Sequence, residues 1–139
     1  MLRSVNLTDY MQRNPFKVRA DDRLFDAIDL ITRNRISGVI VVDAEDRLVG
    51  MLSELDCLRA IVAATYNQSA DVGWVHEYMT AAVISCRISD NIVDVAVDMM
   101  AKGHRRRPVI NHDGSLAGVI TCRRLLEVIS SFNDPRKPR

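Results

Sequence analysis

The sequence repeats itself at a fixed distance, and this repeat constrains the possible folds more than any other feature. Residues 48–53 (LVGMLS) and 116–121 (LAGVIT) share one pattern, and their glycines lie 118 − 50 = 68 residues apart. The same offset places Tyr10-Met11 on Tyr78-Met79. Roughly ten of about fifty aligned positions are identical without a gap, which indicates a tandem duplication.

Within each copy, the hydrophobic pattern predicts the order strand, helix, strand, strand, helix. Residues 39–42 (VIVV) are continuously apolar and β-branched, which is typical of a strand buried on both faces. The other elements expected in the first copy are a short helix within 5–12, a strand at 16–18, a helix over 24–31, a strand at 48–52 and a helix from Ser53 that turns Leu55, Leu58, Ile61 and Val62 inward. Those of the second copy are a short helix at 75–79, strands at 83–85, 109–110 and 117–120, a helix from Asp90 and a last helix marked by Leu125, Leu126 and Ile129.

The chain length and the repeat together predict the domain organisation. A unit of some sixty residues is marginally stable alone, so we expect the two copies to pack as one α/β (α+β) module about a pseudo-two-fold axis. The predicted divisions are a first repeat at 1–64, a connector at 65–74, a second repeat at 75–131 and a disordered basic tail at 132–139. Residues 1–131 then form the module.

Composition and charge exclude several classes of function. The net charge is +1 and 5% of the residues are aromatic, so nothing global favours a nucleic-acid partner. No apolar run resembles a signal peptide or a membrane span. Cys57, Cys86 and Cys122 follow no disulfide or metal pattern, which predicts free thiols and a cytoplasmic location. The sequence has no nucleophile–base arrangement or phosphate-binding loop, and its histidines lack metal-site spacing, so we expect neither an enzyme nor a metal protein.

The helix start at Ser53-x-x-Asp56 allows two interpretations. It matches a capping box, in which the two side chains bond the free backbone N–H groups of the first turn. It also matches a nucleoside phosphate site, because a carboxylate can accept hydrogen bonds from both ribose hydroxyls and the helix start can donate to phosphate. The spacing alone leaves both open. In the second copy the corresponding residue is Arg124, which has no acceptor for a hydroxyl.

Three features of the sequence point to a known family. They are the repeated glycine–apolar–apolar–hydroxyl strands, the Tyr-Met phrase before each copy, and the correspondence of residues 36–43 (ISGVIVVD) with 105–111 (RRRPVIN). Together they resemble a tandem pair of cystathionine-beta-synthase (CBS) domains, also called a Bateman module. The resemblance covers the chain from about Val5 to Ile129. It implies a stand-alone regulatory module that binds an adenosyl ligand (AMP, ADP, ATP or S-adenosylmethionine) between its repeats and signals to a partner protein. It also implies a homodimer formed through the helices.

The resemblance further implies which residues contact the ligand. Asp56 would hold the ribose, while Ser53 and the helix start would face the phosphate. Arg106 corresponds to a phosphate-facing position, and Arg123 and Arg124 to a second basic position. The positions of the adenine slot are Met51, Val83, Ile84 and Pro108.

A second cleft, formed by Phe16, Lys17, Gly38, Ile40 and Thr121, is expected to be altered or empty because Arg124 replaces the carboxylate. Two alternative functions remain open at this stage. One is a dimerisation or scaffold module without a ligand. The other, which the near-neutral charge disfavours, is a nucleic-acid-binding module that uses the arginines at 105–107, 123 and 124.

Overall fold

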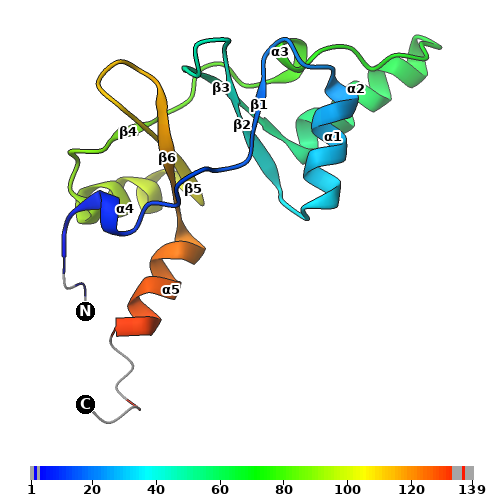
Figure 1. Ribbon diagram of the computed structural model, residues 1–139. Helices are drawn as coiled ribbons and strands as arrows, with labels where there is room; N and C mark the ends of the chain where they lie inside the picture. The colour runs from blue at the N-terminus through cyan, green and yellow to red at the C-terminus, as the bar shows by residue number, and fades with distance from the viewer. Residues whose placement is uncertain (1, 3, 133–135, 137–139) are drawn as a thin grey trace. The chain divides into compact units, whose positions relative to one another are not determined.

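Each repeat builds a three-stranded sheet with helices beside it, in the predicted order of elements (Figure 1). The computed structural model describes residues 2, 4–132 and 136. The first half contains the 3-10 helix η1 (Leu7–Asp9), β1 (Lys17–Arg19), α1 (Leu24–Arg33), β2 (Gly38–Val42), β3 (Leu48–Ser53) and α2 (Glu54–Tyr66). The second half contains α3 (Val75–Tyr78), β4 (Cys86–Arg87), α4 (Ile92–Lys102), β5 (Arg106–Ile110), β6 (Leu116–Thr121) and α5 (Cys122–Phe132). The predicted α/β class with two repeats is confirmed.

The two sheets have the same topology. In each sheet the middle strand pairs in parallel with the short first strand and antiparallel with the last strand, giving the orders β1-β2-β3 and β4-β5-β6. Every residue of β2 is buried, as its apolar β-branched sequence predicts. The register places Gly38 opposite Ser53, and Arg106 opposite Thr121. The hydroxyl residue at the end of the last strand is therefore paired with a glycine in the first repeat and with an arginine in the second.

The first strand of the second sheet lies later in the chain than predicted. The apolar run at 83–85 suggested a strand there, but β4 consists of Cys86 and Arg87. The run lies in an irregular segment before β4, and Val83 N–H donates to the carbonyl of Ala81 at 3.0 Å. The repeat offset identifies the strand better than hydrophobicity does, because Cys86 corresponds to Val18 of β1.

The segment that precedes each repeat packs on the other repeat. Gln12 forms an antiparallel bridge with Val119 of β6, and Thr80 forms the corresponding bridge with Met51 of β3. Leu7 and Tyr10 are fully buried in the core that contains β5 and α4. The spatial units are therefore 84–139 with 1–15, called unit 1, and 16–83, called unit 2. The predicted divisions at 1–64, 65–74 and 75–131 follow the sequence repeat, whereas the spatial units exchange the entry segments.

This exchange explains why each repeated strand contains a glycine. A Cβ atom on Gly118 would lie 2.5 Å from the carbonyl oxygen of Gln12 and 2.6 Å from the Cγ atom of Met11. A Cβ atom on Gly50 would lie 2.8 Å from the Met79 sulfur and 2.8 Å from the Thr80 carbonyl oxygen. The glycines therefore allow the entry segment to cross directly over the strand.

The prediction that the large apolar residues of α2 face inward is wrong. Leu55 is 65% exposed and Leu58 54% exposed, and Ile61 and Val62 are exposed as well. The buried face of the helix carries smaller residues, Asp56, Cys57 and Ala60. Apolar residues occur at helical spacing on two sides of α2, so periodicity alone could not identify the side that faces the sheet.

Some predictions fall at the ends of the described chain. Phe132 ends α5, and the rest of the predicted disordered tail lies outside the described residues except for Arg136. The side chain of Ile129 is also outside the described set, whereas Leu126 of α5 is exposed. Within residues 2, 4–132 and 136, no helix has the length and apolarity needed to cross a membrane.

Gly118→Ala tests the close crossing of the entry segment. We expect a loss of about 1–3 kcal/mol in the free energy of unfolding, because the new methyl group meets backbone that cannot move without breaking the bridge to Gln12. Urea denaturation measures the loss. Gly103→Asn is the control, since this helix-ending glycine has a φ of 68° and open space around it, and asparagine tolerates that conformation. Equal stability of the Gly118→Ala variant and the wild type would contradict the close packing.

Candidate functional site

Asp56 occupies the first turn of α2 and completes a capping box with Ser53. The backbone N–H of Asp56 donates to Ser53 Oγ at 3.1 Å, and Ser53 N–H donates to Asp56 Oδ2 at 2.9 Å. The Asp56 residue is 5% exposed. The capping interpretation of the sequence is therefore confirmed, and it uses one of the two carboxylate oxygens.

The other oxygen of Asp56 has a replaceable partner. Arg59 Nη1 donates to Asp56 Oδ1 at 2.9 Å, but the Arg59 side chain is 72% exposed. Ion pairs with an exposed, flexible partner contribute little free energy. A ligand hydroxyl can thus replace Arg59 at Oδ1 while Oδ2 continues to cap the helix. Capping and ligand binding by Asp56 are compatible.

Thr80, which the sequence analysis did not single out, lies beside this helix start. Met51 N–H donates to the Thr80 carbonyl at 2.9 Å, and Thr80 N–H donates to the Met51 carbonyl at 2.8 Å. The backbone groups of Met51 are therefore already satisfied, which leaves its side chain as the contribution it can make to an adenine slot. The repeat offset could have identified Thr80, since it follows the second Tyr-Met phrase as Gln12 follows the first.

The other predicted ligand contacts are divided between the two units. Met51, Ser53, Asp56 and Val83 belong to unit 2, whereas Ile84, Arg106, Pro108, Arg123 and Arg124 belong to unit 1. Each unit by itself therefore holds only part of the predicted set.

Arg106 and Arg107 of β5 point to opposite sides of their strand and have different roles. Arg107 is 3% exposed, and its guanidinium donates to Asp98 Oδ2 and contacts His104 Nδ1. Hydrogen bonds from Lys102 and then from Arg107 lower the pKa of Asp98. Arg106 is half-buried, and this desolvation lowers the pKa of its guanidinium, which nevertheless stays charged at neutral pH. Arg107 is thus structural, whereas Arg106 is the half-buried and more accessible of the two cations.

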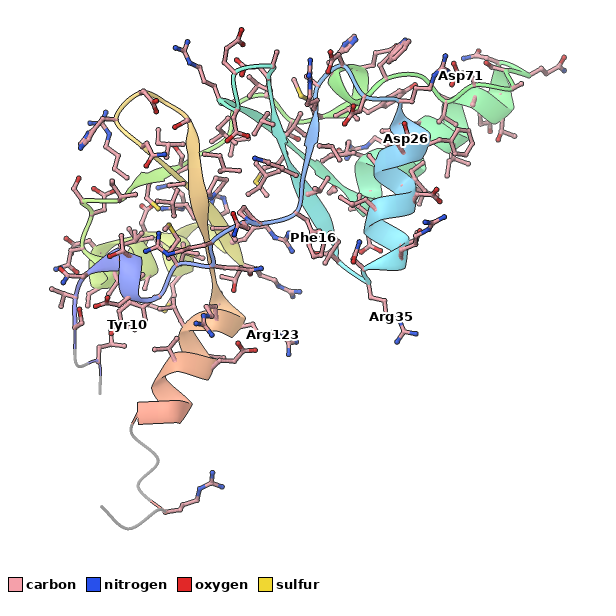
Figure 2. The ribbon with its side chains drawn as sticks, in the orientation of Figure 1. Tyr10, Phe16, Asp26, Arg35, Asp71 and Arg123 are labelled. Carbon is pink, nitrogen blue, oxygen red and sulfur yellow. The ribbon has the colours of Figure 1, made fainter. Side chains whose placement is uncertain are left out.

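The residues predicted for the second cleft are also divided between the units. Phe16 is exposed just before β1 (Figure 2), and Lys17 makes an ion pair with Asp46. Gly38 and Ile40 are buried in β2, and these four residues belong to unit 2. Thr121 belongs to unit 1.

The helix start in unit 1 has only half of the capping box seen in unit 2. Arg124 N–H donates to Thr121 Oγ1 at 3.0 Å, which matches the bond between Asp56 and Ser53. The reciprocal bond requires an acceptor at position 124, and a guanidinium provides none. The Arg124 side chain instead lies 3.8 Å from Glu127.

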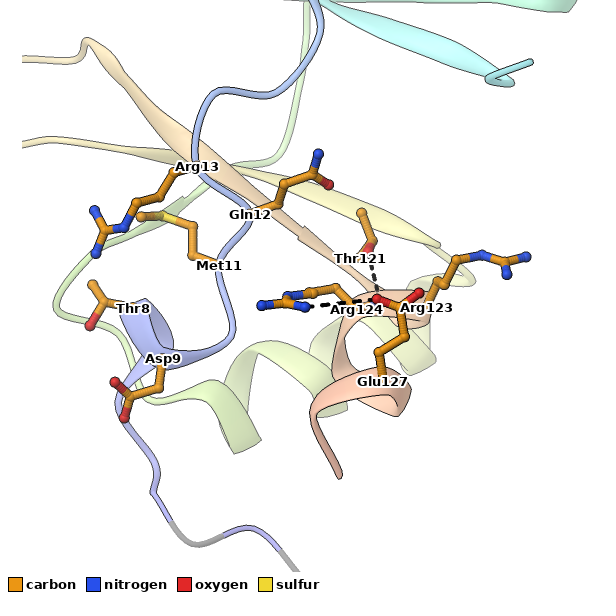
Figure 3. A pocket seen from close by; sticks show the side chains of 9 residues that line it. All are labelled: Thr8, Asp9, Met11, Gln12, Arg13, Thr121, Arg123, Arg124 and Glu127. Atoms are coloured by element: carbon orange, nitrogen blue, oxygen red, sulfur yellow. Dashed lines mark hydrogen bonds and ion pairs between the residues drawn. The ribbon is translucent and has the colours of Figure 1, made fainter. Parts of the chain in front are cut away.

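A cavity of about 590 Å³ lies beside this helix start in unit 1 (Figure 3). The entry segment and the start of α5 line it, and the sequence analysis had assigned only Thr121, Arg123 and Arg124 of its residues to a ligand site. The lining residues are Thr8, Asp9, Met11, Gln12, Arg13, Thr121, Arg123, Arg124 and Glu127. The cavity exists because the bridge between Gln12 and Val119 holds the entry segment beside β6.

Two of the three cysteine thiols are buried. Burial raises the pKa of the Cys86 thiol to about 12 and also raises that of the Cys57 thiol, so neither is an activated nucleophile. Across residues 2, 4–132 and 136, no group of three or more His, Cys, Asp or Glu side chains is arranged to hold a metal ion.

Comparison with known proteins identifies the family from the two repeats. The CBS domain matches this chain twice, at residues 7–63 and 75–131. The chain belongs to the CBS domain family. The predicted resemblance to a tandem CBS pair is confirmed.

Two solved structures of CBS proteins with nucleotides are similar to this chain. One is CBSX2 in complex with AMP, with 25% identity, a TM-score of 0.80, and coverage of 92% of this chain and 98% of that one. The other is the cytosolic domain of the Mg²⁺ channel MgtE in complex with ATP, with 26% identity, a TM-score of 0.69, and coverage of 85% and 46%.

Two curated relatives are considerably longer than this chain. Inosine-5'-monophosphate dehydrogenase of Aquifex aeolicus is 30% identical over 115 residues, which are 82% of this chain but 22% of the enzyme. The protein MJ1225 of Methanocaldococcus jannaschii is 25% identical over 88% of this chain and 42% of its own length. This chain thus spans less than half the length of either relative.

Proposed function

We propose that this chain is a regulatory module that binds one adenosyl ligand at Asp56 and passes the ligand's presence to a partner protein. AMP, ADP, ATP and S-adenosylmethionine are the candidate ligands, and no catalytic cofactor is involved. The observation that carries the proposal is the state of the Asp56 carboxylate. One oxygen fixes its position through the cap, and the other is held only by the exposed Arg59.

The ribose end of the ligand accounts for this arrangement. Two vicinal hydroxyls are donors, and a fixed carboxylate with an accessible oxygen accepts them without reorganisation. The buried Oδ2 bond to Ser53 N–H keeps the carboxylate in place during the exchange. Similarity to proteins crystallised with AMP and ATP supports an adenine nucleotide as the ligand class.

The phosphate end of the ligand is assigned to Arg106, with Ser53 at the helix start. Arg106 is half-buried, and a charged group that is already partly desolvated binds an anion more strongly than an exposed one. Arg123 and Arg124 are the further candidates of this kind. Met51, Val83, Ile84 and Pro108 are proposed for the adenine, as the family resemblance implies.

Replacing Asp56 with asparagine tests this assignment. Asp56→Asn keeps the side-chain shape and an acceptor for the cap but removes the charge that accepts the ribose hydroxyls. We expect AMP affinity to fall by about 1–3 kcal/mol, the range for a lost charge-assisted hydrogen bond. Calorimetric titration measures it. Asp26→Asn is the matched control, since Asp26 is an exposed residue in the first turn of α1 in the same unit (Figure 2).

A second variant tests whether the ligand displaces Arg59 from Asp56 Oδ1. Arg59→Gln should leave AMP affinity equal to or higher than that of the wild type, because the ligand no longer displaces an ion pair. Equal AMP affinity of the wild type and the Asp56→Asn variant would refute the site. A large loss of AMP affinity in the Asp26→Asn control would mean that the effect is not local.

We also propose that the module is a homodimer formed through its helices. Exposed apolar side chains occur at equivalent positions of the two repeats, with Phe25 corresponding to Val93 and Leu58 to Leu126. On α2 the exposed set is extended by Leu55, Ile61, Val62 and Tyr66. Helix faces that expose several large apolar side chains are typical of protein–protein contacts. A cytoplasmic location is proposed as well, supported by the free thiols of all three cysteines.

Leu58→Glu tests the dimer. A carboxylate at this position would be desolvated by a partner copy, so we expect the variant to sediment as a monomer where the wild type sediments as a dimer. Thr65→Glu on the same helix is the control, because it adds the same charge at an exposed polar position. A wild type that is monomeric at micromolar concentrations, or a Leu58→Glu variant that stays dimeric, would contradict the proposal.

A further inference from the structure

We infer that the two copies of the chain pair antiparallel, so that unit 2 of each copy packs on unit 1 of the other and Arg59 meets Glu127. The inference rests on the homodimer proposed above and specifies which surfaces of the two copies meet. Exposed apolar residues leave this choice open, because Leu58 in unit 2 is 54% exposed and Leu126 in unit 1 is 68% exposed. Pairing like units and pairing unlike units would both bury apolar surface.

The first argument is that the two units carry opposite net charges. Unit 2 contains seven Lys or Arg residues and eleven Asp or Glu residues, whereas unit 1 contains twelve and seven. With neutral histidines their net charges are therefore −4 and +5, although the whole chain carries only +1. Pairing like units would bring two acidic surfaces together and two basic surfaces together. Pairing unlike units brings each surface against its complement, and such complementarity selects the orientation of partners.

The second argument is a reversal of charge beside the exposed leucines. The repeat offset places Leu58 on Leu126, and the next residue is Arg59 in unit 2 but Glu127 in unit 1. The Arg59 side chain is 72% exposed and the Glu127 side chain is 56% exposed. Within the described part of the chain, each makes one ion pair, to a residue of its own helix. Both charged groups are therefore accessible to another copy.

Two-fold symmetry makes this reversal discriminate between the two arrangements. At a contact between like units that is centred on one of the leucines, a residue beside the axis meets its own copy. Arg59 would then face Arg59 of the other copy, and Glu127 would face Glu127, which is unfavourable. Pairing unlike units places Arg59 against Glu127 in two equivalent contacts. The same positions therefore repel in one arrangement and attract in the other.

Other charged residues do not contribute to this choice. Asp26 and Asp94 hold equivalent positions in the first turns of α1 and α4, so they present the same charge in both units. Arg107 is buried and paired with Asp98, so it cannot reach a second copy. The inference therefore depends on the net charges of the units and on the pair formed by Arg59 and Glu127.

Charge reversal on the full chain tests the pairing of Arg59 with Glu127. Without ligand, we expect Arg59→Glu to raise the dimer Kd about tenfold or more in sedimentation equilibrium, because a glutamate would then face Glu127. Adding Glu127→Arg should return the Kd to within about threefold of the wild type, since the pair is restored with its charges exchanged. Arg47→Glu is the matched control, because it reverses the same charge at an exposed residue of unit 2 directly before β3.

Thermal melts confirm that each of these variants is folded. An unchanged Kd for Arg59→Glu would overturn the inference, because pairing like units merely replaces one like-charge contact with another. An equal rise in Kd for Arg47→Glu would overturn it as well, since the effect would then come from net charge away from the helices. A double variant that fails to recover would also overturn it, because a defect within unit 2 is not repaired by a change in unit 1.

Disulfide trapping distinguishes failure of this arrangement from failure of the homodimer. Leu58→Cys and Leu126→Cys chains, each also carrying Cys122→Ser to remove the exposed native thiol, are mixed under reducing conditions and then oxidised. We expect a cross-linked dimer in the mixture and none from either variant alone, because positions 58 and 126 face each other across unlike units. Cross-linking of the Leu58→Cys chain with itself would overturn the antiparallel arrangement and leave the homodimer standing. A monomeric wild type would overturn both.

Discussion

Two short antiparallel bridges, Gln12 with Val119 and Thr80 with Met51, determine how this chain is organised. Each joins the segment that enters one repeat to the last strand of the other. The bridge requires glycine beneath it, because a Cβ atom at Gly50 or Gly118 would overlap the crossing segment. It also completes the cores, since a unit of about sixty residues buries too little apolar surface alone. Unit 1 is therefore built from two distant parts of the sequence, whereas unit 2 is the continuous stretch 16–83 and includes the segment that enters the second repeat.

The same bridges place side chains beside the two helix starts where the repeats differ. In unit 2, Thr80 lies next to the strand that leads to Ser53 and Asp56. In unit 1, the segment containing Thr8 and Arg13 lies beside Thr121 and Arg124. One framework thus presents a carboxylate in one unit and guanidinium groups in the other. Since a carboxylate accepts hydrogen bonds and a guanidinium only donates them, the two helix starts offer opposite hydrogen-bonding groups.

The fold was largely predictable from sequence because duplication shows every element twice. The apolar run of β2 and the glycine strands β3 and β6 are correct in place and type. Errors arose where local pattern was ambiguous. Val83 and Ile84 are apolar enough for a strand but lie in an irregular segment, since the chain before them is held at Met51. The exposed Leu55 and Leu58 were expected in the core because α2 carries apolar residues on two sides.

The candidate site was only partly predictable. The Ser53-x-x-Asp56 spacing identified the helix start and its cap, which are local features. Arg13 and Thr8 were missed because their position depends on pairing with a strand more than 100 residues away. Arg59 was missed because its contact with Asp56 depends on the rotamer of a long exposed side chain. Long-range pairing and surface rotamers leave little trace in a single sequence.

The central claim is that the difference between Asp56 and Arg124 leaves one adenosyl site in each chain. Native mass spectrometry of the purified protein across an AMP titration tests it most directly, because it counts ligands per protein molecule. The account predicts that binding saturates at one AMP per chain, and that each bound species differs from the next by the mass of AMP. Saturation at two AMP molecules per chain with similar affinities would contradict the claim, because the unit with Arg124 would then bind a nucleotide without a carboxylate.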